Sequence, residues 1–158
     1  QRVGNRQPLS TPFGCFATSD GQVVIAVLSG KQFTALAGLI GAPEAAQDPR
    51  FASDESRTEH EPAVKALIEA WSQRLTTEQA VAALAGLGLP AAPIWDIAQA
   101  AGSEHARARG LVSLLGATPV VGQPVRFDGE KPLAATPAPA LGGDRAAILR
   151  AFGLEETA

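Results

Sequence analysis

Residues 13–28 read Phe-Gly-Cys-Phe-Ala-Thr-Ser-Asp-Gly-Gln-Val-Val-Ile-Ala-Val-Leu, and this stretch decides the fold. Its two apolar parts, Phe13 to Thr18 and Gln22 to Leu28, are strand candidates. Ser19-Asp20-Gly21 lies between them, and Asp-Gly readily takes the positive φ that tight turns need. The stretch therefore predicts a β-hairpin near the start of the chain.

A helix is predicted directly after the hairpin, over residues 31–40. Ser29 is a suitable N-cap, and apolar residues recur behind it at helical spacing. Gly41 suits the position after a helix C-terminus, and Pro43 prevents the helix from continuing. The segment 43–60 that follows is polar and contains an Asp-Pro turn.

The rest of the chain mixes helices with short strands. Thr76 and Gln79 have the spacing of a capping box, which marks a helix N-terminus. The predicted helices cover 62–74, 77–87, 97–101 and 145–152, with Asp96 and Asp144 as caps of the last two, and the predicted strands cover 92–95, 111–115 and 124–127. This order has no regular βαβ alternation, so it predicts an α+β fold. We expect a small antiparallel sheet (the hairpin plus additional short strands) packed with several helices, then an extended return segment and a C-terminal helix.

Composition excludes several classes of function. The chain has 158 residues, the length of one domain. Its net charge is −3 and it has no basic stripe with interleaved aromatic residues, so nucleic acid is not expected as a partner. No apolar run approaches the roughly 20 residues of a membrane span, so a membrane is not expected either. Cys15 is the only cysteine, which fits a reducing compartment and predicts a cytoplasmic protein.

Residue types that bind metals or act as nucleophiles are sparse. His60 and His105 are far apart and have no Cys or His partner at metal-ligand spacing, so no metal site is expected and both are interpreted as surface residues. Cys15 has no neighbour in sequence that would lower its pKa, and we interpret it as a buried, inert thiol. The chain has no Gly-x-Ser-x-Gly motif.

Three further features have two interpretations each. The carboxylates of segment 48–59 share it with Arg50 and Arg57, which favours a salt-linked loop over an acid/base pair. Gly142-Gly143 precedes a helix N-terminus and could bind an anion, but a plain turn is the favoured interpretation. Gly4-Asn5-Arg6 could cradle a phosphate or cover a ligand, and otherwise is a flexible terminus.

Several short motifs follow one another in an informative order. They are Gly4-Asn5-Arg6, Pro12-Phe13-Gly14, Asp20-Gly21, Asp48-Pro49-Arg50-Phe51-Ala52 with Arg57, Gly88-Leu89-Pro90-Ala91-Ala92-Pro93-Ile94, Arg109-Gly110, Pro124-Val125-Arg126-Phe127 and Ala138-Pro139-Ala140-Leu141-Gly142. Each is weak by itself, but in this order they resemble the C-terminal half of a family III CoA-transferase. This is the CaiB/BaiF family, which includes formyl-CoA and carnitine CoA-transferases and α-methylacyl-CoA racemases.

The resemblance implies the small domain of a two-domain subunit in an intertwined homodimer. It implies that residues 1–12 are a linker, that residues 13–128 are the small domain, and that residues 129–158 are a return segment and terminal helix. That last part would pack on a missing Rossmann-like large domain. The catalytic aspartate would lie upstream, so no catalytic residue is expected in this chain. The substrates implied are a coenzyme A thioester and a small carboxylic acid, with no permanently bound cofactor.

The residues expected near the substrate are Gly4, Asn5, Arg6, Ser29 and Gly30. In the racemase branch a catalytic glutamate follows the second hairpin strand. The corresponding place here is Leu28-Ser29-Gly30-Lys31, which has no carboxylate for proton exchange, so the transferase is favoured over the racemase. A non-catalytic interaction module on the same fold is the remaining alternative.

The return segment suggests a further hypothesis. Ile148, Leu149, Phe152 and Leu154 would form an apolar face whose partner is the missing domain. An isolated chain would then expose this face, and would either associate with itself or leave its tail disordered.

Overall fold

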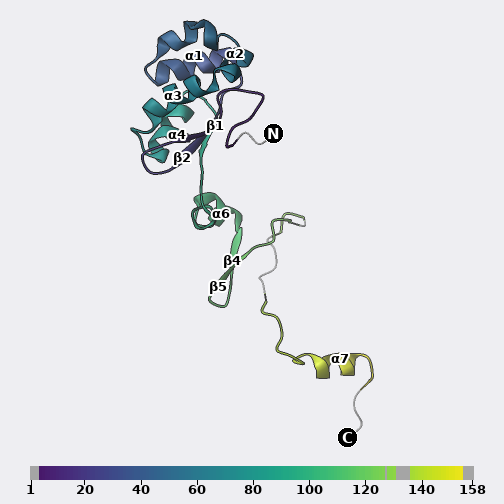
Figure 1. Cartoon of the computed structure of the whole chain (residues 1–158). Coiled ribbons are helices and arrows are strands. Elements are labelled where there is room, and N and C mark those ends of the chain that lie inside the picture. Colours follow the sequence, from purple (N-terminus) through teal and green to yellow (C-terminus); the bar gives the residue numbers. More distant parts are fainter. Residues whose placement is uncertain (1–3, 127, 131–135, 155–158) are drawn as a thin grey trace. The chain divides into compact units, whose positions relative to one another are not determined.

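The computed structural model describes residues 4–126, 128–130 and 136–154. The chain divides into two compact units, unit 1 from Gln1 to Ile94 and unit 2 from Trp95 to Ala158 (Figure 1). Helices occur together with small antiparallel sheets, so the predicted α+β class is confirmed. The small-domain limits given above, 13–128, stay a prediction.

The predicted hairpin forms the first two strands of a three-stranded antiparallel sheet, in the order β1-β2-β3. The strands are β1 (Phe13–Ala17), β2 (Gln22–Ala26) and β3 (Ala91–Pro93). Ala17 pairs with Gln22, and the Thr18 N–H donates to the Gly21 carbonyl at 3.0 Å to close the loop between the strands. The strand predicted over 92–95 is confirmed as β3, which begins one residue earlier and ends two residues earlier than predicted.

The loop uses Gly21 for a reason other than the predicted one. Neither Asp20 nor Gly21 has a positive φ, so that expectation was wrong. A Cβ on Gly21 would instead lie 3.2 Å from Oγ1 of Thr77. The Asp20 carboxylate accepts the Thr77 N–H at 2.7 Å and the Thr77 hydroxyl at 2.9 Å. Glycine thus lets the hairpin tip approach the helix that begins at Thr77.

Four helices pack with this sheet in unit 1. They are α1 (Gly30–Leu39), α2 (Asp54–Glu59), α3 (Glu61–Ser72) and α4 (Thr77–Ala85), with the 3-10 helices η1 (Pro43–Gln47) and η2 (Pro49–Phe51). Ser29 accepts the Gln32 N–H as the N-cap of α1, and Gly41 after its C-terminus has a φ of 77°. The capping box of Thr76 and Gln79 is present at the start of α4. These three predictions are confirmed.

The polar segment 43–60 contains regular structure that its composition did not predict. The Asp48 carboxylate accepts the Arg50 N–H at 2.9 Å and caps η2. The Ser53 hydroxyl accepts the Ser56 N–H at 3.1 Å and caps α2. Polar residues that would mark a loop are here the caps of two short helices.

The core of unit 1 lies between the sheet and the helices. The rings of Phe33 and Phe51 meet edge to face, with centroids 6.0 Å apart. The other buried apolar side chains include Phe16, Val23, Ile25, Val27, Leu36, Val64, Ile68, Leu84 and Leu89. Each buried side chain of this size stabilises the fold by roughly 1.5–3 kcal/mol.

In its described residues, unit 2 has short helices and a two-stranded antiparallel sheet. The elements are α5 (Ile97–Ala101), α6 (Glu104–Arg109), β4 (Val112–Leu115), β5 (Thr118–Val121) and α7 (Arg145–Ala151). The strand predicted over 124–127 was wrong for residues 124–126, and residue 127 lies outside the described residues. Gly116, with a φ of 63°, turns the chain directly into β5. This strand was not predicted, although proline, here Pro119, is tolerated on an edge strand.

The predicted C-terminal helix is confirmed as α7. Asp144 occupies its N-cap position, but no hydrogen bond from the side chain caps the helix. Ile148, Phe152 and Leu154 are 55%, 75% and 65% exposed. An apolar face, named here the α7 face after these three residues, is therefore open to solvent.

Candidate functional site

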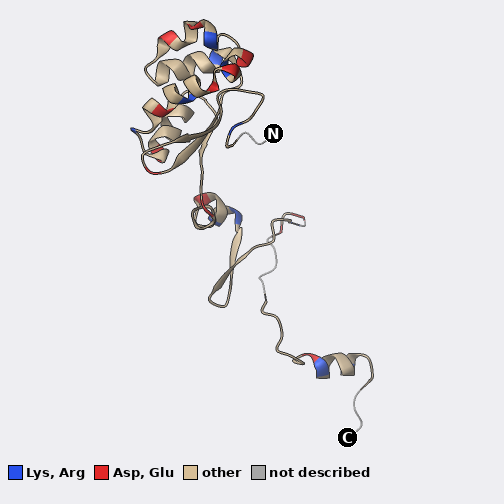
Figure 2. Ribbon diagram, viewed as in Figure 1, with Lys and Arg blue, Asp and Glu red and all other residues tan. Residues whose placement is uncertain are grey.

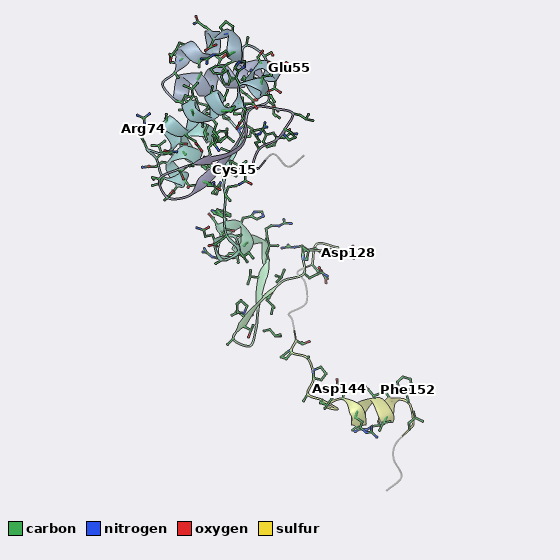
Figure 3. All side chains as sticks on the ribbon, in the orientation of Figure 1. Cys15, Glu55, Arg74, Asp128, Asp144 and Phe152 are labelled. Carbon is green, nitrogen blue, oxygen red and sulfur yellow. The ribbon has the colours of Figure 1, made fainter. Side chains whose placement is uncertain are left out.

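A cavity of about 240 Å³ lies in unit 1 between the N-terminal segment, β1 and the first half of α3. It is lined by residues 4–6, residues 11–16, Glu61, Val64 and Lys65. Cys15, which is labelled in Figure 3, lies on β1 and is one of the residues that line the cavity. Gly4, Asn5 and Arg6, three of the five predicted site residues, thus share one cavity.

The N-terminal segment is held against β1 by backbone contacts. The Cys15 N–H donates to the Asn5 carbonyl at 3.0 Å, and Arg6 forms an antiparallel bridge with Gly14. A Cβ on Gly14 would lie 2.9 Å from the Asn5 carbonyl oxygen and 3.1 Å from the Arg6 Cα. Glycine at position 14 therefore allows the close approach that forms one wall of the cavity.

The turn before β1, which also lines the cavity, is held by the guanidinium of Arg57. The side chain of Arg57 is only 2% exposed. Its Nε donates to the Thr11 carbonyl at 2.7 Å, and its Nη2 donates to the Asp54 carboxylate at 3.0 Å. The same carboxylate accepts the Thr11 N–H at 3.2 Å. The guanidinium also lies 4.9 Å from the centre of the Phe33 ring. Arg57 is thus a structural residue that positions the turn before β1.

Helix α3 is fixed to the far end of β1 by two side chains. β1 is an edge strand, and the N-terminal segment pairs with its outer backbone groups only near Gly14 and Cys15, so the groups of Ala17 need other partners. The Ala17 N–H donates to the Glu69 carboxylate at 3.0 Å, and the buried Ser72 hydroxyl donates to the Ala17 carbonyl at 2.6 Å. These bonds set the position of α3 relative to the strand across the cavity.

Three charged residues line the cavity, namely Arg6, Glu61 and Lys65. Lys65 Nζ lies 3.9 Å from the Glu69 carboxylate, whereas no ion pair between residues 4–126, 128–130 and 136–154 involves Arg6. Charges of both signs are interspersed along the helices of unit 1 (Figure 2). The cavity thus combines two cations and one carboxylate with an apolar strand face.

Two of the sequence interpretations of single residues need correction. Cys15 is a free thiol that is half-buried rather than buried, because the side chains of β1 alternate and only Gly14 and Phe16 lie on its buried side. His60 is half-buried, with Nδ1 2.9 Å from the Ser56 carbonyl oxygen, because it joins α2 to α3. His105 is exposed, as predicted.

The acidic segment 48–59 is a salt-linked segment, as predicted. The Arg50 guanidinium donates to the Asp48 carboxylate at 2.7 Å, and these hydrogen bonds lower the pKa of Asp48. The Arg57–Asp54 pair is the second link. Charge pairing, rather than acid/base chemistry, accounts for Asp48 and Asp54.

Within the described part of the chain, no group of three His, Cys, Asp or Glu side chains could hold a metal ion. Nor does any described helix combine the length and the apolar character that crossing a membrane requires.

The other two predicted site residues, Ser29 and Gly30, lie at the start of α1 and do not line the cavity. The Ser29 hydroxyl accepts the Gln32 N–H at 3.2 Å, and Gln32 Oε1 accepts the Leu28 N–H at 2.9 Å. The polar groups here therefore form a helix cap. Gly142, with a φ of 72°, forms the plain turn that was favoured before α7.

Sequence reasoning missed the residues that α3 contributes to the cavity. Glu61, Val64 and Lys65 have i, i+3, i+4 spacing, which places them on one face of the helix. That spacing was visible in the sequence, but it does not say which element the face meets.

The sequence pattern of CoA-transferase family III matches residues 1–145. Acetyl-CoA:oxalate CoA-transferase from Acetobacter aceti is 33% identical over 156 residues, which are 98% of this chain and 40% of that protein. Succinyl-CoA–D-citramalate CoA-transferase from Chloroflexus aurantiacus is 36% identical over 110 residues, which are 69% of this chain and 27% of that protein.

A solved structure supports the same family assignment. The crystal structure of a CaiB/BaiF family protein from Brucella suis matches with a TM-score of 0.85 and 32% identity, over 98% of this chain and 40% of that one. The chain thus spans at most about two-fifths of the length of these relatives. The resemblance drawn from the order of the motifs is confirmed: this chain belongs to CoA-transferase family III.

Proposed function

We propose that this chain is the small-domain part of an acyl-CoA:carboxylate CoA-transferase. In the intact enzyme, CoA would pass from an acyl-CoA thioester to a carboxylic acid. The observation that carries the proposal is the family match over residues 1–145, together with relatives named as CoA-transferases. Because these relatives are more than twice as long as the matched segment, the nucleophilic aspartate is assigned to a part of the enzyme outside this chain.

The proposal gives the chain a supporting role at the active site. Gly4, Asn5 and Arg6 line the cavity of unit 1, and we assign them to the small-domain side of the substrate site. We assign Ser29 and Gly30, at the start of α1, to a second part of the same substrate site. The intact enzyme is proposed to be an intertwined homodimer in the cytoplasm, and the free Cys15 thiol fits a reducing compartment.

The domain arrangement of the proposal has residues 129–158 returning to the large domain. The α7 face supports this, because its apolar side chains are exposed in this chain. The large domain is the occupant that would bury them.

The acceptor is proposed to be a small dicarboxylic acid. The Acetobacter aceti relative is named for oxalate and the Chloroflexus aurantiacus relative for D-citramalate, and both acids carry two carboxylates. A racemase is disfavoured because Leu28-Ser29-Gly30-Lys31 offers no carboxylate, and its Ser29 hydroxyl serves as a helix cap.

Calorimetric titration of CoA into this chain tests the proposal against a non-catalytic interaction module. The titration is performed with and without the polypeptide encoded directly upstream of Gln1. We expect weak or no CoA binding by the chain alone and saturable binding by the mixture. Equal CoA binding in both titrations would favour the interaction module.

A further inference from the structure

We propose that the cavity between residues 4–6, β1 and α3 binds the free carboxylate of a dicarboxylic acid. Arg6 is the residue that selects such an acid, through its guanidinium. The identity of the acid rests on the proposed function. The inference adds a specificity-determining residue and a site that this chain forms by itself.

The size of the cavity limits its ligand. Pockets for drug-sized ligands hold roughly 300–1,000 Å³, and this cavity holds about 240 Å³. A complete CoA molecule is larger than a drug-sized ligand and does not fit. An acid of four or five carbons is small enough to enter.

The charges favour one carboxylate. Lys65 is already near the Glu69 carboxylate, at 3.9 Å, whereas Arg6 has no ion-pair partner among the described residues. Glu61 is the opposing charge in the cavity, so the three charged lining residues sum to one positive charge. A guanidinium binds a carboxylate through two parallel hydrogen bonds, which a lysine cannot form.

The backbone that carries Arg6 is already in place. Its bridge to Gly14 and the bond from the Cys15 N–H to the Asn5 carbonyl fix this segment on β1. Binding therefore does not have to order the segment, which lowers the entropic cost of association.

The chemistry of CoA transfer explains why such a residue would be useful. One carboxylate of the acid must remain available to form the thioester. The second carboxylate of a dicarboxylic acid is free to bind a cation, and a monocarboxylic acid lacks it. Arg6 would therefore discriminate between these two classes of acid.

Titration of the 158-residue chain with sodium succinate, followed by calorimetry and by NMR of backbone amides, tests the inference. Butyrate is the matched monocarboxylate and inorganic phosphate is the competing anion. We expect saturable succinate binding, amide shifts centred on Gly14 and Cys15, and butyrate binding at least about tenfold weaker, the loss expected for one charge-assisted pair.

Two variants should change the succinate affinity in opposite directions. Arg6→Ala should weaken binding at least about tenfold, and Glu61→Gln should strengthen it about threefold by removing a like charge. Arg74→Ala is the matched control, because Arg74 is an exposed arginine that does not line the cavity (Figure 3). An unchanged urea midpoint for Arg6→Ala establishes that the variant is folded.

The inference would be overturned if succinate binding did not saturate, or if Arg6→Ala and the unchanged chain bound succinate with equal affinity. Phosphate binding tighter than succinate with the same Arg6 dependence would also overturn it, and would assign the cavity to the phosphates of CoA. The titration contains no acyl-CoA. If this chain combined with the upstream polypeptide showed no transfer, the proposed function would be contradicted, but the succinate result would stand.

Discussion

The Nε of Arg57 donates a hydrogen bond of 2.7 Å to the carbonyl of Thr11, joining residues that are 46 positions apart in the sequence. This bond connects α2 to the turn before β1, and that turn lines the cavity. A residue that does not itself line the cavity therefore fixes the turn that forms part of its wall.

Replacing Arg57 by alanine should lower the free energy of unfolding by about 1–3 kcal/mol, because the Thr11 and Phe51 carbonyls lose a buried donor and the part-exposed Asp54 carboxylate loses its ion-pair partner. Urea unfolding measures the change. Arg50→Ala is the matched control, since its ion pair with Asp48 is exposed and should contribute little. Equal stability of the two variants would show that Arg57 does not anchor the turn before β1.

Replacing Gly14 by alanine should detach the N-terminal segment from β1, because the new Cβ would lie 2.9 Å from the Asn5 carbonyl oxygen. We expect a loss of about 1–3 kcal/mol and faster hydrogen exchange at the Cys15 N–H. The control is Gly38→Ala, a helical glycine with open space around it, which should be stabilising by up to about 1 kcal/mol. Unchanged exchange at Cys15 in Gly14→Ala would contradict the prediction.

Asp20 should make the stability of unit 1 sensitive to acid. The Thr77 backbone N–H and hydroxyl lower the pKa of Asp20 below its ordinary value of 3.8. A lowered folded-state pKa means that the ionised group stabilises the fold above the unfolded value, and that this contribution disappears as the pH falls through the folded value.

The urea midpoint of the unchanged chain should therefore fall more steeply with decreasing pH than that of Asp20→Asn, over the range from pH 3.8 downward. Asparagine keeps the shape and an accepting oxygen, so only the charge is removed. Glu44→Gln, which removes an exposed carboxylate in η1, is the control. Parallel pH profiles for Asp20→Asn and the unchanged chain would contradict the assignment.

The α7 face should cause self-association of the isolated chain, because Phe152 is 75% exposed with Ile148 and Leu154 beside it. Phe152→Ser should reduce the concentration-dependent association that analytical ultracentrifugation detects. Leu9→Ser removes a side chain that is 79% exposed in unit 1 and should have no such effect. A chain that stays monomeric at every concentration would argue against an apolar docking face.

Local signals in the sequence predicted much of the fold. Ser29, Gly41 and the Thr76–Gln79 pair each specify a helix end through contacts within a few residues, and all three were confirmed. The hairpin was predicted, but the role of Gly21 depends on Thr77, which is 56 residues away. Contacts between residues so far apart in the chain leave no pattern in the local sequence.

The candidate site was predictable only in part, for the same reason. Gly4, Asn5 and Arg6 came from a motif, whereas the contribution of Glu61 and Lys65 depends on how α3 packs on β1. The strand β5 was not predicted, although its Pro119 is compatible with an edge strand, where proline is tolerated.

Transfer of CoA from acetyl-CoA to a dicarboxylic acid, measured with this chain alone and with the polypeptide encoded directly upstream of Gln1, is the most direct test of the central claim. The account predicts no transfer by the chain alone and restored transfer by the combination, abolished when an aspartate of the upstream partner is replaced by alanine. Turnover by the chain alone, or no turnover by the combination with any acyl-CoA and acid pair, would contradict it.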